Sequence, residues 1–269
     1  MAIAVVRPAD APQPGDGYVQ SFARGLEVIR SFSAQAPQQT LSEVASRTGL
    51  SRAGARRILL TLQTLGYVET DGRLFRLTAR ILDLGFAYLS SMPIWSLADP
   101  VMEALVEEVK ESCSAAVLDG TDIVYVLRVP VHKIMRISLG VGSRLPAYCT
   151  SMGRVLLAGL TDAQAEQRLA ASDRQPLTRA TLTELDALMA SVRQARQQGW
   201  CLVDQELEEG LISLAAPITD RAGTTVAALN ISGQANRTSA SVMQATMLPQ
   251  LLAAARRIST LLAGRPTPG

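Results

Sequence analysis

The 269-residue sequence contains one histidine, three cysteines and only two lysines among its 26 basic residues. The single histidine, His132, excludes a metal site built from several imidazole ligands. The cysteines, Cys113, Cys149 and Cys201, lie too far apart in the sequence to make a zinc-binding pattern. No glycine-rich phosphate-binding motif is present either. We therefore expect neither a metal ion nor a cofactor.

Long apolar runs are also missing. No stretch reaches the roughly 20 residues that a membrane-spanning helix needs, and the first residues do not have the pattern of a signal peptide. Residues 1–17 contain several prolines and predict a disordered lead-in. We expect a cytoplasmic protein that does not interact with a membrane, and whose cysteines are buried and reduced.

The net charge of +2 conceals an uneven distribution along the chain. Residues 21–80 hold nine arginines against four acidic residues, a balance of +5. Residues 81–269 hold 16 basic and 18 acidic residues, a balance of −2. A basic N-terminal module followed by a near-neutral remainder is typical of a chain that binds DNA with one part and has another task for the rest.

Residues 41–66 predict two short helices joined by a tight turn. The first helix is expected over residues 41–48, and Gly49 supplies the left-handed residue that often ends a helix. Ser51 is a good N-cap for the second helix. Leu60 points away from the apolar stripe of that helix, and we expect it to contact another part of the protein. The stripe itself consists of Ala55, Ile58, Leu59, Leu62 and Leu65.

The other side of the second helix is basic. Four arginines occur between residues 47 and 57 with no acidic residue among them. Arginine can bind phosphate or the edge of guanine through two parallel hydrogen bonds. The small residues Ala53 and Gly54 would let the backbone approach a DNA groove closely. These residues favour a DNA-binding helix-turn-helix, and the alternative is an ordinary amphipathic helix pair with a solvated basic face.

A hairpin is expected directly after the second helix. Residues 67–70 and 74–77 predict two short strands around Asp71-Gly72, a strong turn signal. A hairpin in this position is a wing, whose arginines could reach phosphates or the neighbouring minor groove. The module is therefore predicted to be a winged helix that binds double-stranded DNA. The expected DNA-binding residues are Thr40, Arg47, Ser51, Arg52, Ala53, Gly54, Arg56, Arg57, Arg73 and Arg76.

Further helices flank this module. Residues 18–33 predict its first helix, and a loop around Pro37 leads to the helix pair. Residues 79–91 predict a linker helix that packs against a second copy of itself. The buried stripe of the first helix is expected to be Phe22, Leu26, Ile29 and Phe32. The expected domains are 18–78 for the winged helix-turn-helix, 79–92 for the linker helix and 93–264 for a second, larger domain, followed by a tail at 265–269.

The region after residue 93 mixes strands with helices, which predicts an α+β domain with a sheet flanked by helices. Helices are expected at 94–111, 150–160, 162–171, 183–199 and 239–262. Strands are expected at 114–118, 123–129, 134–139, 201–203, 211–217 and 225–231, with a loop around Gly140, Gly142 and Pro146.

Three segments together, ESCSAAVLDGTDIVYVLRVP, RLPAYCTSMGRVLLA and GLISLAAPITDRAGTTVAALNISG, resemble the IclR family of bacterial transcription regulators. The resemblance covers residues 18–264. The segment YVLRVPVHKIMRISLGVGSRLPAYCTSMGRVLLA is most similar to the PcaR/PcaU/PobR group, which regulates β-ketoadipate pathway and related aromatic-acid catabolism genes. The resemblance implies a winged helix joined to a GAF-like effector domain, a homodimer or dimer of dimers, and a small organic-acid effector, aromatic or ring-shaped. Another organic-acid pathway is the alternative.

The helix expected to begin near Thr150 and Ser151 suits such an acid. Its first N–H groups have no intrahelical acceptors, and the helix dipole adds partial positive charge there. Motif matching to the family places the rest of the pocket around it. Asp204 is acidic and would accept a ligand hydroxyl, whereas Arg136 and Arg144 are alternative carboxylate partners. A purely structural role is the alternative for each of the expected effector-binding residues Thr150, Ser151, Met152, Asp204, Leu211, Ser213, Asn230, Ser232, Arg136 and Arg144.

An enzyme is a distant alternative. Cys149 precedes the start of a helix, which lowers a thiol pKa and would favour a nucleophile, but a Cys-His pair would need His132 beside it. His132 follows Pro130 and Val131 in a loop with no evident orienting acid. We therefore predict no catalytic residues. A DNA-binding protein without a ligand is a third possibility, and the size of the second domain argues against it.

Overall fold

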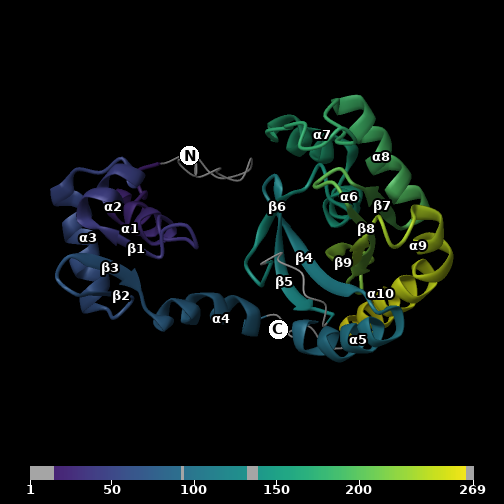
Figure 1. Cartoon of the computed structure of the whole chain (residues 1–269), viewed down its shortest axis with the longest axis horizontal. Coiled ribbons are helices and arrows are strands. Elements are labelled where there is room, and N and C mark those ends of the chain that lie inside the picture. Colours follow the sequence, from purple (N-terminus) through teal and green to yellow (C-terminus); the bar gives the residue numbers. More distant parts are fainter. Residues whose placement is uncertain (1–14, 92–93, 132–138, 265–269) are drawn as a thin grey trace. The chain divides into compact units, whose positions relative to one another are not determined.

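The computed structural model describes residues 15–91, 94–131 and 139–264. These residues form two compact units, one up to residue 91 and one from residue 94. Each unit contains a hydrophobic core of its own. The two units are coloured purple to blue and teal to yellow in Figure 1, and each is described separately below.

The first unit combines helices with a small antiparallel sheet whose strand order is β1-β3-β2. This architecture confirms the expected winged helix: two helices in sequence, followed by a β2–β3 hairpin. Its elements are α1 (Gln20–Arg30), β1 (Gln38–Thr40), α2 (Leu41–Thr48), α3 (Arg52–Thr64), β2 (Val68–Thr70), β3 (Leu74–Leu77), the 3₁₀ turn η1 (Ala79–Ile81) and α4 (Leu82–Ser91).

Capping interactions explain where α2 and α3 begin and end. At the start of α2, the Thr40 hydroxyl accepts from the Glu43 N–H at 3.3 Å, and the Glu43 carboxylate accepts from the Thr40 N–H at 2.7 Å. Gly49 ends α2 at φ 66°, a conformation that favours glycine. The Ser51 hydroxyl then accepts from the Gly54 N–H at 3.1 Å and caps α3. Both helix starts agree with the sequence prediction.

The core of the first unit lies between α1, α2, α3 and the hairpin. The predicted inner stripe of α3 is largely confirmed, since Ala55, Leu59 and Leu62 are buried. Leu65 is an exception and is 51% exposed, because α3 ends at Thr64 and Leu65 caps it. Leu60 is exposed as well, and the structure shows no contact that buries it. The buried core residues are Val28, Val44, Ala45, Ala55, Leu59, Leu62 and Val68.

One prediction for the start of this unit was wrong, and another was confirmed only in part. The residues after Pro37 are not a loop: Gln38–Thr40 form β1, which pairs with β3 and makes the hairpin a three-stranded sheet. Of the stripe predicted for the first helix, Ile29 and Phe32 pack partly buried against the core, whereas Phe22 is 69% exposed and Leu26 is also exposed. The fully buried residue of α1 is Val28. An apolar stripe identifies the face of a helix that is able to pack, but it does not specify that the same chain covers it.

The second unit is built on a six-stranded antiparallel sheet in the order β6-β5-β4-β9-β8-β7. The strands are β4 (Ser112–Asp119), β5 (Asp122–Val129), β6 (Arg144–Pro146), β7 (Cys201–Asp204), β8 (Leu211–Thr219) and β9 (Thr225–Gln234). The helices are α5 (Ile94–Val109), α6 (Ser151–Ala158), α7 (Asp162–Ala171), α8 (Leu185–Gln198), α9 (Ala240–Thr246) and α10 (Leu248–Ala263).

Helices cover both faces of this sheet. Ala116, Ala215 and Ala228 belong to the core that the sheet shares with α6 and α8, while the alternate residues Ile212 and Leu214 are buried on the opposite side. Figure 1 shows α7 and α8 beyond α6. It also shows α5 alongside α10, and these two helices contact β4, β5 and β8. The α+β architecture is therefore confirmed; the GAF-like description stays a prediction.

Sequence patterns missed two details of the second unit. The short strand β6 lies in a segment that was expected to be a loop, and it pairs with β5 from Asp122 to Val124. The expected helix at 239–262 is two helices, which meet at Met247 just before Pro249 in the first turn of α10. The strand expected at 134–139 falls almost wholly on residues 132–138, outside the described residues.

No single helix in the described ranges is both long enough and apolar enough to cross a membrane. The bent pair Ala79–Ser91 and Ile94–Val109 reaches that length and hydropathy only when both helices are taken together. The second member of the pair, α5, buries much of its apolar face, including Ile94, Trp95 and Met102.

Leu59→Ala tests the orientation of α3. Because Leu59 is fully buried, we expect the first unit to lose about 2–5 kcal/mol of stability. Leu60→Ala is the matched control, and it should change stability by less than about 0.5 kcal/mol. Chemical denaturation followed by circular dichroism reports both units, whereas fluorescence of Trp95 and Trp200 reports the second unit alone. Equal losses in the two variants would mean that α3 is oriented differently.

Candidate functional site: a basic helix face and an internal cavity

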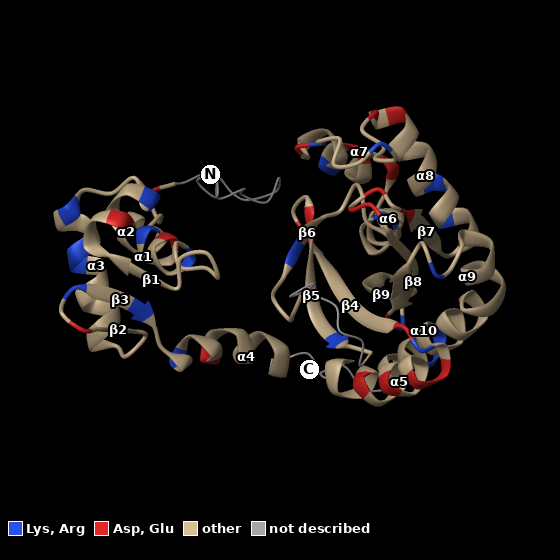
Figure 2. Cartoon of the chain, viewed as in Figure 1, with Lys and Arg blue, Asp and Glu red and all other residues tan. Residues whose placement is uncertain are grey.

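The predicted DNA-binding residues are displayed together on the first unit. Arg52, Arg56 and Arg57 are exposed along α3, and Arg47 is exposed on α2. Figure 2 shows this basic character on α3. Ser51 and Ala53 are exposed too, while Thr40 and Gly54 are half-buried and support the helix starts. This face offers several planar cations and the free N–H groups of a helix start, both of which suit phosphate.

The hairpin turn adds one free arginine and one paired arginine. Asp71 accepts backbone N–H bonds from Leu74 at 2.8 Å and Arg73 at 2.9 Å, which lowers the pKa of its carboxyl and fixes the turn. Arg73 is exposed at this turn. Arg76, in contrast, donates to Glu69 across the hairpin at 2.6 Å. The wing therefore presents Arg73 more openly than Arg76.

Arg80 was not among the predicted residues, yet it joins α3 to the segment that follows the wing. One of its Nη1 N–H groups donates to the Leu65 carbonyl at the end of α3, at 2.7 Å. Its side chain lies over Gly66, where an added Cβ would come within 2.8 Å of Nη1. Gly66 has φ 81°, a backbone conformation that favours glycine, whereas the nearby end of the flexible Arg80 side chain could move aside. An arginine outside a helical motif gives no sequence signal for this role.

The second unit contains a cavity of about 860 Å³ that is partly open to solvent. It lies between the first turn of α6 and the face of the sheet formed by β4, β5, β8 and β9. Such a volume is within the range of small-molecule binding sites. Seven of the predicted effector residues line it: Thr150, Ser151, Met152, Leu211, Ser213, Asn230 and Ser232.

The start of α6 opens into this cavity. The Thr150 hydroxyl accepts from the Gly153 N–H at 3.2 Å and donates to the Pro146 carbonyl at 3.0 Å. The N–H groups of Ser151 and Met152 belong to the first turn, so no earlier turn supplies acceptors for them. Together with the helix dipole, they make a favourable position for a carboxylate.

Hydroxyl and amide groups of the sheet continue this polar lining. Ser151 and Ser213 share a hydrogen bond of 2.9 Å between their hydroxyl oxygens, which joins α6 to β8. On β9, the Asn230 side-chain amide donates to the Ser232 hydroxyl at 2.8 Å. The Asn230 side-chain oxygen accepts from the Ser114 N–H at 3.1 Å. These bonds orient the polar side chains before any ligand is present.

Three predicted effector residues are not placed in the cavity. Asp204 is exposed at the end of β7 and does not line it. Arg144 forms surface ion pairs with Asp119 at 2.6 Å and Asp122 at 3.1 Å, so its charge is already used. Arg136 lies outside the described residues. Asp204 was predicted from the family motif and Arg144 from its charge, and neither reveals the direction of a side chain.

Sequence reasoning missed several residues of the cavity wall. Arg128 and Tyr125 on β5 line it, as do Arg237 and Glu208 at exposed positions and the buried Glu111. Arg128 lies on β5, where the regular alternation of inward and outward residues is interrupted by a shift in the pairing with β4. The sequence of β5 therefore does not reveal that Arg128 faces the cavity.

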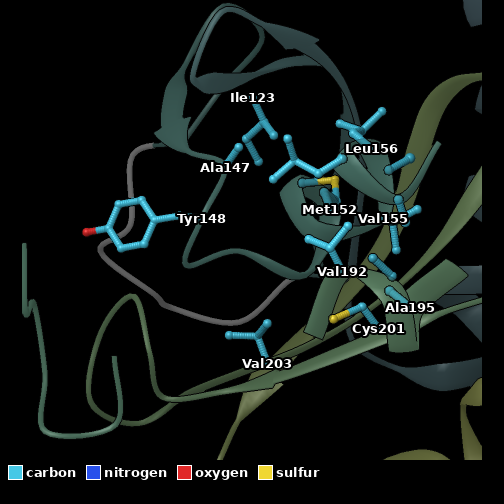
Figure 3. Close-up of a cluster of buried hydrophobic side chains, with 14 of the residues drawn as sticks. Ile123, Ala147, Tyr148, Met152, Val155, Leu156, Val192, Ala195, Cys201 and Val203 are labelled. Atoms are coloured by element: carbon cyan, nitrogen blue, oxygen red, sulfur yellow. The ribbon is translucent and has the colours of Figure 1, made fainter. Parts of the chain in front are cut away.

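The helix α6 is held in place by close packing and by a buried ion pair. A Cβ at Gly153 would lie 2.1 Å from the Ala147 carbonyl oxygen, so only glycine allows this approach. Arg154, next in the helix, donates to both carboxylate oxygens of Glu206, at 2.7 and 2.5 Å, and to the Tyr148 carbonyl at 3.1 Å. Figure 3 shows the apolar side of α6, where Met152 and its neighbours pack among buried side chains of the same core.

The same environment makes Cys149 a poor nucleophile. Burial raises the pKa of its thiol to about 12, so it stays protonated near neutral pH. The expectation that a helix start would lower this pKa was wrong, because desolvation is the larger effect. All three cysteines are buried and free. Within residues 15–91, 94–131 and 139–264, no group of three or more metal-ligating side chains is arranged around a common point.

Comparison with known proteins places these two sites in a family. A family model described as the C-terminal domain of the bacterial transcriptional regulator IclR matches residues 86–260, and the IclR helix-turn-helix model matches residues 21–72. The chain belongs to the IclR family. It is thus a DNA-binding transcriptional regulator and not an enzyme.

Individual IclR-family relatives cover almost the whole chain. The chain is 43% identical over 248 residues to the Pca regulon regulatory protein of Pseudomonas putida, covering 92% of this chain and 85% of the relative. A crystal structure of a transcriptional regulator from Rhodococcus sp. RHA1 is 51% identical and has a TM-score of 0.82, covering 91% of this chain and 98% of that one. The expected likeness to the PcaR/PcaU/PobR group is thereby confirmed.

A third relative is described with a ligand. It is a double mutant of the inducer-binding domain of PobR from Acinetobacter, in complex with 3-hydroxybenzoic acid. It is 30% identical, has a TM-score of 0.59, and covers 62% of this chain and 98% of that domain. The likeness falls within the part of the chain that carries the cavity.

Arg154→Met tests the buried ion pair. We expect a loss of about 3–5 kcal/mol, because Glu206 would keep a buried charge without its cation. Arg193→Met is the matched control: its ion pair with Asp162 is exposed, so its loss should change stability far less than loss of the buried pair. Denaturation followed by tryptophan fluorescence measures both. The double variant Arg154→Met, Glu206→Leu should recover part of the loss, and no recovery would contradict this account.

Proposed function

We propose that this IclR-family chain is a ligand-responsive regulator that controls genes of aromatic-acid catabolism. In this proposal the arginine face of α3 binds double-stranded operator DNA, and the cavity of the second unit binds a small aromatic or ring acid. The observation that carries it is the first turn of α6, whose N–H groups and buried hydroxyls open into the cavity of the second unit. Another organic-acid pathway is the alternative.

The DNA-binding half of the proposal rests on geometry and charge. Arg52 and Arg56 stand one helical turn apart on the exposed face of α3. A helix with this face inserted in the major groove presents arginines to base edges. Arg47 on α2 and Arg73 on the wing flank it and would contact phosphates.

The effector half rests on the chemistry of the cavity. A carboxylate at the start of α6 would accept from the Ser151 and Met152 N–H groups, and a ring would pack against Met152 and Leu211. The aromatic acid bound by the PobR domain supports this class of ligand. Asn230 and Ser232 supply polar groups for substituents on the ring.

We also propose that two copies associate through the first unit. Phe22 and Leu26 on α1 and Leu84 on α4 line one apolar surface groove, and Leu82 and Phe86 are largely exposed. Exposed apolar area of this extent is typical of an interface. A homodimer, or a dimer of dimers, would set two α3 helices on successive half-sites. The buried free cysteines favour the cytoplasm as its location.

Effector binding is tested by thermal shift. The ligands are protocatechuate, 4-hydroxybenzoate, β-ketoadipate, shikimate, quinate and simple 2-oxo acids. A ligand of the folded state raises the melting temperature by mass action. We expect a selective shift with one aromatic or ring acid, and a smaller one in Ser151→Ala, whose DNA affinity without ligand should be unchanged. A shift with 2-oxo acids alone would favour another pathway, and no shift would contradict the acid-binding site.

DNA recognition is tested with Arg52→Ala. Because Arg52 is exposed in the first turn of α3, loss of a base contact should cost about 1–3 kcal/mol of binding free energy. The probe is a duplex selected from a random pool by the wild-type protein, and binding is followed by fluorescence anisotropy at constant salt. Arg221→Ala removes an exposed arginine of the second unit and is the control. Unchanged affinity of Arg52→Ala would exclude a base contact by this residue.

A further inference from the structure

The strand β5 contains one residue more than its partner β4. Arg128 pairs with Ser114 and Leu127 with Ala115, but the next residue of β4, Ala116, pairs with Tyr125. Val126 is therefore the extra residue of a β-bulge.

This bulge changes the face to which Arg128 belongs. In a regular strand, residues three positions apart point to opposite faces, so Tyr125 and Arg128 would be separated by the sheet. The extra residue brings both onto one face. Their partners Ser114 and Ala116 are two apart on β4 and share that face, which is the one that packs against α6. Both Tyr125 and Arg128 consequently line the cavity.

Among the residues that the structure describes, only the Ser114 hydroxyl accepts a hydrogen bond from the Arg128 side chain. One Nη1 N–H donates to the Ser114 hydroxyl at 3.4 Å, which is a long hydrogen bond. Within the described part of the chain, Arg128 forms no ion pair. A guanidinium has five N–H donors. Burial raises the pKa of the neighbouring Tyr125 to about 12 even though the charge of Arg128 opposes this, so the phenol stays neutral and offers a hydrogen bond.

The position of Arg128 relative to α6 gives the cavity two ends. The strand order places β5 three strands away from β8, which is about 14 Å at 4.7–4.8 Å per strand. Ser213 on β8 is the residue bonded to Ser151 at the start of α6. Arg128 and the start of α6 therefore line the same cavity from separate elements, and its volume of about 860 Å³ leaves room for a ligand between them.

We propose that Arg128 binds an anionic or hydrogen-bond-accepting group at the far end of the effector and thereby selects acids that carry two such groups. The inference rests on the proposed function, because it assumes that the first carboxylate lies at the start of α6. Arg128 is then a specificity-determining residue. The bulge at Val126 places its side chain on the face of the sheet that lines the cavity.

The test compares two acids that differ only in the second group. Isothermal titration of the full chain with benzoate and with terephthalate measures the preference for the dianion. Hexanoate and adipate form a flexible second pair. We expect Arg128→Met to weaken the binding of terephthalate or adipate by about tenfold or more, which corresponds to the loss of a hydrogen bond between charged groups. The monoacids should change by less than about twofold.

Two further variants and a control define the outcome. Arg128→Lys keeps the charge and should retain part of the preference, which guards against a folding defect in Arg128→Met. Arg256→Met removes an exposed arginine on α10 and should change neither affinity. If Arg237→Met at the cavity rim abolishes the preference instead, or if Arg128→Met weakens both acids of a pair equally, the role of Arg128 is refuted while acid binding stands. If no acid binds to the wild type, the proposed function fails as well.

Discussion

The buried pair of Arg154 and Glu206 is the interaction on which the second unit depends. Burying two charges is costly, and the cost is offset only where every donor and acceptor is placed. Here the guanidinium is bidentate with the carboxylate and also bonds the Tyr148 carbonyl, while Glu206 additionally accepts from the Leu182 N–H at 3.1 Å. The pair thus fixes α6 to the segment before it and to two loops that come later in the chain. The cavity has a defined shape because the helix that forms its wall cannot rotate.

The two units reach stability by different means. The second has a wide sheet covered on both faces, with most of its inward residues aliphatic and small. The first has a short core and relies on local devices, namely the capping box at Thr40, the left-handed Gly49 and the Arg80 contact with the end of α3. A small domain of this kind buries a low fraction of its surface. Its exposed apolar side chains on α1 and α4 are consistent with a partner that contributes the missing burial.

Local signals were the part of this fold that the sequence predicted well. Ser51, Gly49 and the Asp71-Gly72 turn act through atoms within a few residues, so the ends of α2 and α3 and the position of the wing followed from them. Features that depend on distant partners were missed. The strand β1 forms because it pairs with β3, which is distant in the sequence. Leu65 is exposed because α3 ends one residue earlier, at Thr64. The guanidinium of Arg144 forms ion pairs with two aspartates. Arg128 belongs to the same group, since a bulge is defined by the pairing of two strands and not by either alone.

The contact between Gly153 and Ala147 has a mechanical consequence. With no room for even one methyl group, α6 is unable to slide toward the segment that precedes it. The opposite wall of the cavity is built differently, because β5 with its bulge pairs at its outer edge with the short strand β6. One wall is therefore set by a direct backbone contact, and the other ends in a strand of only three residues.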